Sequence, residues 1–193
     1  MARLFSYVVE HDEGRSPNPF GGYCTLANCK FSVSGKRPNI VELAKKNDWI
    51  VGTGGARVQR SSGHGTIVYA MKITSKLPLT QYLAQQEFQH REQGYKVLAK
   101  GRRFALVSKE FYYFGANAVP IPPELNKEHP FEKKGPGFRS DFDEAFIASF
   151  EQWLRKHHNR GVHGHPCLSR TSGIRWQTCS HKRGCADNKR RGC

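Results

Sequence analysis

Two apolar segments joined by a glycine-rich, basic loop constrain the fold of this chain more than any other feature. Residues 48–55 and 66–73 have the β-branched and aromatic content of strands. The loop over 54–65 holds four glycines together with Arg57 and Arg60, so we expect a β-hairpin whose loop is more than a plain turn. Glycines let backbone N–H groups approach an anion, and the arginines supply charge. Ligand contact is one hypothesis for this loop, and a solvated hairpin tip is the other.

The length of 193 residues predicts one domain with an appendage, and 12 Phe, 7 Tyr and 3 Trp suffice for its core. No apolar run is long enough for a transmembrane helix, and the apolar stretch at the start is too short for a signal peptide. We therefore expect a cytoplasmic protein with reduced cysteines and no membrane partner.

Positive charge is concentrated near the C-terminus. The net charge is +15, and residues 155–193 hold ten Lys or Arg against a single Asp. A basic surface is typical of proteins with a polyanionic partner, most simply DNA or RNA. The alternative is that the charge only provides solubility.

The remaining pattern predicts an α+β fold: a small, mostly antiparallel β-barrel or sheet with peripheral helices and a basic Cys/His-rich C-terminal tail. Ser140 is the expected N-cap of the clearest amphipathic helix, followed by acidic residues in its first turn. Residues 39–47 fit either a short helix or a loop. The other expected strands cover 4–10, 23–30, 103–108 and 111–115, and the expected helices cover 78–88 and 142–153.

The loop Pro17–Gly22 is a second candidate for ligand contact. Its prolines restrict the backbone, its paired glycines permit close approach, and Asn18 carries a donor and an acceptor suited to a base edge. Phe20 and Tyr23 are of the type that stacks on bases. The alternative is a structural corner with Phe20 in the core.

Aromatic residues of the predicted strands are further stacking candidates, namely Trp49, Tyr112 and Tyr113. Alternation in the run Phe111–Phe114 sends two side chains to each face of a sheet. One pair fills the core, and partial exposure in a ligand cleft is an explanation for the other. Core packing is the ordinary alternative for each ring.

Acid–base chemistry has three candidate residues near these loops. His64 with Asp12 or Glu13 has the groups for proton transfer, although no motif fixes the distance between them. The sequence contains no nucleophile elbow, phosphate-binding Walker loop or deaminase metal motif, and it predicts no cofactor.

The tail is rich in possible zinc ligands: His163, His165, Cys167, Cys179, His181 and Cys185. They are numerous enough for one tetrahedral site, but their spacing matches no standard zinc finger. A disordered basic segment without metal is the favoured interpretation, and zinc is the alternative.

Several separated segments resemble the nucleotide modification associated domain 2 family. They are Tyr7–Val9, Pro17–Ala27, Asp48–Gly54, Val68–Met71, Phe111–Gly115 and Gly135–Phe142 with the helix that follows. The resemblance covers about residues 3–157. It implies a bacterial or phage setting and a link to modified nucleotides in DNA or RNA, without an agreed set of catalytic residues.

These observations predict a domain over 1–157 and a poorly ordered basic tail over 158–193. The first hypothesis for function is a module that binds a nucleotide or nucleic acid and senses a modified base. The second is a base-modifying enzyme that uses His64, and the third is an accessory protein that docks through its tail. The predicted ligand contacts are Asn18, Phe20, Tyr23, Trp49, Thr53, Gly54, Arg57, Arg60 and Tyr113.

Overall fold

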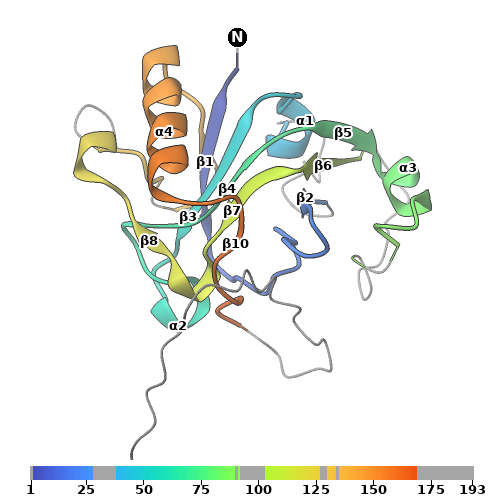
Figure 1. Ribbon diagram of the computed structural model, residues 1–193, viewed down its shortest axis with the longest axis horizontal. Coiled ribbons are helices and arrows are strands. Elements are labelled where there is room, and N and C mark those ends of the chain that lie inside the picture. The colour runs from blue at the N-terminus through green and yellow to red at the C-terminus, as the bar shows by residue number, and fades with distance from the viewer. Residues whose placement is uncertain are drawn as a thin grey trace, which may run out of the picture.

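A mixed sheet of seven strands forms the centre of the protein (Figure 1). The structure is a computed structural model that describes residues 2–27, 38–89, 91, 103–126, 130–133 and 135–168. From one edge to the other, the strands are β10 (Gly161–Val162), β7 (Glu110–Tyr113), β4 (Thr66–Lys72), β3 (Trp49–Gly54), β1 (Leu4–Val9) and β9 (Phe138–Arg139), with β8 (Val119–Pro120) also paired to β4.

A second, antiparallel sheet and short helices surround this centre. The small sheet has the order β2 (Cys24–Leu26), β6 (Phe104–Ser108) and β5 (Ser75–Pro78). The α-helices of the described residues are α1 (Ile40–Leu43), α2 (Val58–Ser61), α3 (Leu79–Ala84) and α4 (Glu144–His157), and 3-10 turns cover Gly115–Asn117 and Pro123–Leu125. The protein is therefore mixed α+β, as expected. Neither sheet closes within the described residues, so the open-sheet alternative describes the fold and the barrel does not.

The predicted hairpin is confirmed. Strands β3 and β4 pair antiparallel from Trp49↔Lys72 to Thr53↔Ile67, with α2 in the loop between them. The other neighbour of β3 is β1, which runs parallel to it over six residues. Parallel strands bring their carboxyl ends to the same edge, so the loops after β1 and β3 lie together.

Both faces of the main sheet are covered, and this decides the fate of the aromatic run in β7. Phe111 and Tyr113 belong to the core on the face toward α1 and the small sheet. Tyr112 and Phe114 belong to the core on the face covered by α4. All four are at most 5% exposed, so both pairs pack in the core, and neither has the partial exposure that was one explanation from the sequence.

The long helix α4 begins later than predicted. Its N-cap is Asp143 rather than Ser140, and the Asp143 carboxylate accepts a 2.7 Å hydrogen bond from the backbone N–H of Phe146. A side-chain cap of this kind contributes about 1 kcal/mol. The buried face of the helix carries Ile147, Phe150 and Leu154, which pack on Trp49 and Tyr112 of the sheet.

Segment 39–47, which fits a helix or a loop in the sequence, contains the helix α1. A capping box between Asn39 and Glu42 caps its N-terminus. Beyond α4, residues 158–168 include β10, which pairs parallel with β7. The expected boundary between residues 157 and 158 stays a prediction, and residues 169–193 lie outside the described residues. No helix in the described residues is long and apolar enough to cross a membrane.

Candidate functional site

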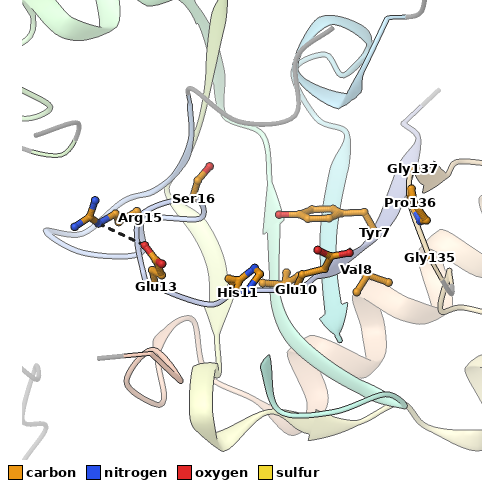
Figure 2. A pocket seen from close by; sticks show the side chains of 11 residues that line it. Tyr7, Val8, Glu10, His11, Glu13, Arg15, Ser16, Gly135, Pro136 and Gly137 are labelled. Carbon is orange, nitrogen blue, oxygen red and sulfur yellow. Dashed lines mark ion pairs between the residues drawn. The ribbon is translucent and has the colours of Figure 1, made fainter. Parts of the chain in front are cut away.

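A cleft of about 570 Å³ opens at the edge of the main sheet where β9 separates from β1. The two strands pair only at Ser6↔Arg139 and Tyr7↔Phe138. Beyond these positions β1 continues into its loop, and the segment Gly135–Gly137 lines the other part of the cleft. Figure 2 shows the lining side chains, which are Tyr7, Val8, Val9, Glu10, His11, Glu13, Arg15, Ser16 and Pro136.

The cleft combines an aromatic ring with charged groups of both signs. The Tyr7 hydroxyl is hydrogen bonded at 2.7 Å to the buried Tyr69 hydroxyl, which fixes the ring. The loop supplies an exposed ion pair between Arg15 and Glu13, with 3.8 Å between Nε and Oε2 (Figure 2). Such an exposed pair is weak, so both side chains are available to a ligand.

Asp12 belongs to the same loop after β1, and its side chain is fully buried. Its carboxylate accepts hydrogen bonds from the Tyr113 hydroxyl at 2.6 Å and from the backbone N–H of Cys167 at 3.2 Å. Burial raises the pKa of Asp12, and these hydrogen bonds offset part of the rise. Burial likewise raises the pKa of Tyr113. With its oxygens held in this way, Asp12 orders the segment around Cys167 and is not positioned in the cleft for proton transfer.

The loop after β3 meets the loop after β1, as parallel strands require. The backbone N–H of Asp12 donates to the carbonyl of Arg60 at 2.9 Å, and the Arg60 guanidinium lies 3.0 Å from Nε2 of His11. Arg60 therefore lies beside a residue that lines the cleft. Arg57 is exposed at the start of α2 and does not line it.

Glycines of this loop have a structural explanation. A Cβ on Gly54 would overlap the carbonyl oxygen of Gly63 and crowd the hydroxyl of Thr66. The N–H of Gly55 donates to the carbonyl of Ser61 at 3.2 Å. The loop folds back on itself, so the glycine pair is used for close backbone contact within the protein.

The predicted contacts at 17–23 lie on the small sheet, outside the cleft. Asn18 pairs with Thr25 of β2, and its side-chain oxygen accepts from the N–H of Phe20 at 3.3 Å. Phe20 lies edge-on to Tyr113 at 6.4 Å. Tyr23 packs edge-on against Phe88 at 5.3 Å. These contacts are those of a structural corner.

The predicted residues of β3 are enclosed. Trp49 is at the opposite end of the strand from the cleft and is 0% exposed, with its ring edge-on to Phe150 at 5.8 Å. It offers no face to a base. Thr53 is also 0% exposed, and its hydroxyl donates to the carbonyl of Tyr7 at 3.2 Å.

His64 has a carboxylate partner, but not one of the two considered from sequence. Its Nδ1 lies 2.8 Å from Oε1 of Glu132, whose side chain is only 9% exposed. The same oxygen accepts from the N–H of Gly65 at 3.2 Å. Glu132 precedes the Gly135–Gly137 segment of the cleft by three residues.

The described zinc candidates point to separate partners. His163 donates to the carbonyl of Asn159, His165 contacts the carbonyl of Pro166, and the Cys167 thiol lies 3.1 Å from the Ser62 hydroxyl. No three His, Cys, Asp or Glu side chains in the described part of the chain gather to hold a metal. Cys179, His181 and Cys185 lie outside the described residues.

Sequence reasoning missed most of the cleft, namely Tyr7, Glu10, His11, Arg15, Ser16 and Gly135–Gly137. The cleft depends on pairing between β1 and β9, which are far apart in the sequence. The available signals were the charged residues directly after β1 and the Gly-Pro-Gly sequence before β9.

Comparison with known proteins identifies the family. The model of nucleotide modification associated domain 2 matches residues 1–102 and 93–173. The chain belongs to this family. Both strands that form the cleft lie inside the matched region, and the family name associates the chain with nucleotide modification. Among curated proteins and among solved structures, none matches the chain.

Proposed function

We propose that the protein binds a nucleotide unit, free or within DNA or RNA, in the cleft between β1 and Gly135–Gly137, and that it distinguishes modified bases. The observation that carries the proposal is a cleft of about 570 Å³ at a sheet edge in a chain of this family. Ligand pockets have volumes of about 300–1,000 Å³, so the cleft has the size of a pocket that can hold a nucleotide.

The lining chemistry supports a division of roles. Pro136 offers an apolar surface for a base over the buried Tyr7, while Glu10 and Ser16 offer hydrogen-bonding groups for its edge or for the sugar. Arg15 supplies charge for a phosphate, and Arg60 adds charge through its contact with His11.

The test is to titrate the four common nucleotides and methylated or hydroxymethylated versions against matched variants. Arg15→Ala should weaken binding of all nucleotides about tenfold, because phosphate carries no base information. Glu10→Gln should change the ranking among bases. Lys46→Ala removes an exposed cation from the turn before β3, outside the cleft, and serves as the control.

Arg57→Ala separates two positions for the phosphate. A loss with Arg57→Ala but not with Arg15→Ala would move the site to the loop around α2. Equal affinities of wild type, Arg15→Ala and Glu10→Gln for every nucleotide would reject the cleft.

A second candidate function is base modification by an enzyme, supported by the pair of His64 with Glu132. A buried carboxylate that holds Nδ1 orients an imidazole for proton transfer through Nε2. The wild-type protein should then convert DNA or nucleotides into a nucleoside of new mass. His64→Ala and Glu132→Gln should both abolish this product without a loss of nucleotide affinity. Turnover that survives both changes would contradict this role.

A further inference from the structure

The edge of the main sheet opposite the cleft carries a cluster of half-exposed rings. We call it the ring patch and define it as Trp153, Lys156, His157, His158, Arg160, Val162 and His163. It joins the last turn of α4 to β10, which is the edge strand beside β7 (Figure 1). Val162 is 47% exposed and is one of two large hydrophobic residues so exposed in the described residues.

The rings of the patch are in contact with one another. His163 stacks on the buried Phe114 ring with 5.1 Å between centroids and an interplanar angle of 26°. His158 meets Phe114 edge-on at 4.8 Å and Trp153 edge-on at 5.2 Å. The row therefore runs from α4 across the sheet edge and is anchored on a core residue.

Cations border this row of rings, and the nearby acids Glu110 and Glu151 are already in ion pairs. Glu110 on β7 is paired with Arg160 at 2.8 Å and with Arg155 at 3.2 Å. Arg155 also pairs with Glu151, which is in turn paired with Lys72, while Lys156 and His157 are exposed at the end of α4. Residues 169–193, outside the described residues, add seven Lys or Arg and one Asp to the sequence.

The imidazoles add a charge that depends on pH. Burial lowers the pKa of His158 below its ordinary 6.5, and proximity to His163 and His157 lowers it further. His158 is the C-cap residue of α4, whose last turn carries Arg155 and Lys156, so positive charge around it opposes its protonation. A bound polyanion reverses this opposition.

We propose that the ring patch is a docking surface for single-stranded nucleic acid, distinct from the cleft. Unpaired bases stack on rings, and phosphates between them need cations at the spacing of a strand. The ring patch has rings and cations next to one another. Bases in a duplex are already stacked on each other, so the patch suits an unpaired strand. The proposal does not rest on a nucleotide in the cleft, because the two sites lie at opposite edges of the sheet.

The test measures binding of a fluorescent 15-nucleotide oligo(dT) to the full chain at fixed salt. The double variant Lys156→Ala/His157→Ala removes two exposed side chains and should weaken binding about tenfold, since it removes a phosphate contact and a stacking ring. The control is Lys45→Ala/Lys46→Ala, two exposed cations in the turn before β3, which should change affinity less than twofold. Unchanged melting temperatures verify folding.

Three results would overturn the proposal. They are an equal loss in the control, a duplex of the same length bound more tightly than oligo(dT), or equal displacement by heparin and by oligo(dT) matched in charge. Binding to anionic vesicles that the double variant abolishes while oligo(dT) binding persists would assign the patch to a membrane surface. Lys156→Ala/His157→Ala should leave mononucleotide affinity of the cleft within twofold, so a failure of the cleft is separable from a failure of the patch.

Discussion

The two edges of the main sheet end in similar strands and yet present different surfaces. β9 and β10 are both two residues long, and each pairs with one neighbour over those residues alone. At the β9 edge the chain departs through Gly135–Gly137, which leaves a cleft. At the β10 edge α4 returns alongside, and its last turn fills the space with rings. The comparison teaches that a short edge strand ends pairing, while the segment beside it decides between a hollow and a surface.

The charges differ in the same way. The cleft holds Glu10 and Glu13 with Arg15, and is nearly balanced, as suits a small ligand with polar edges. The ring patch contains Lys156 and Arg160 and no acid, and the neighbouring Glu110 and Glu151 are in ion pairs, as suits a long polyanion.

The largest expected effect is on the salt dependence of binding to oligo(dT). With the cations of residues 169–193 added to those of the ring patch, affinity should fall about 10³–10⁵-fold between 50 and 200 mM salt. A chain ending at residue 168 should remain folded and lose only about tenfold over the same range, because a few cations remain. Fluorescence anisotropy at several salt concentrations measures both slopes. Equal slopes would show that the tail contacts no phosphate.

The next largest effect is expected at Asp12, which links the loop after β1 to β7 and to the segment after β10. Asp12→Ala should lower the free energy of unfolding by about 2–4 kcal/mol, because the Tyr113 hydroxyl and the Cys167 N–H lose their buried acceptor. Chemical denaturation measures the loss. Labelling of Cys167 by a thiol reagent should also accelerate, since its segment is no longer held.

The pH dependence of this residue has a definite sign. Because the pKa of Asp12 is higher in the folded protein than its ordinary 3.8, its contribution to stability is full below pH 3.8 and falls as pH rises through the folded pKa. Asp12→Asn should remove this part of the slope in unfolding experiments at several pH values. An unchanged slope would mean that Asp12 is solvated in the folded protein.

A smaller effect is expected at the cleft. Tyr7→Phe removes the hydroxyl bonded to Tyr69 but keeps the ring, and should weaken nucleotide binding about two- to fivefold through looser placement of the ring. Calorimetric titration compares it with Tyr7→Leu, which also removes the buried ring that supports the cleft and should cost more. Equal effects of the two changes would show that the Tyr7 ring does not shape the cleft.

The smallest effect concerns protonation of the ring patch. Lowering the pH from 7.5 to 5.5 should raise oligo(dT) affinity about two- to fivefold, because protonated imidazoles add positive charge. His158→Gln should reduce this rise, as the lowered pKa of His158 places its protonation within or below this range. Nucleotide binding to the cleft should not share the His158 effect, which separates the two edges again.

Local patterns predicted the elements better than the site. The continuous apolar and β-branched runs of β3 and β4 and the spaced aromatic residues of α4 are local signals, and the hairpin and the helix were both predicted. The cap of α4 was misplaced because Ser140 and Asp143 are both good caps, and only the path of the chain after β9 selects between them.

The burial of the predicted site residues could not be read from the sequence. Trp49 and Tyr113 have the residue types of a binding surface, but the sheet is covered on both faces and encloses them. Asp12 and Glu13 are neighbours in sequence, yet one is buried among donors and the other lies in the cleft. Only tertiary pairing across most of the chain makes that distinction.

The buried position of Asp12 has a consequence for synthesis on the ribosome. Its side chain finds a partner on β7, and both its side chain and its carbonyl accept from Cys167 and Leu168, far later in translation. Until those residues emerge, the loop after β1 lacks its anchor, and β1 lacks β9. The contacts of β1 and of the loop after it are therefore completed late in synthesis. A product truncated before residue 167 would be a substrate for quality-control proteases.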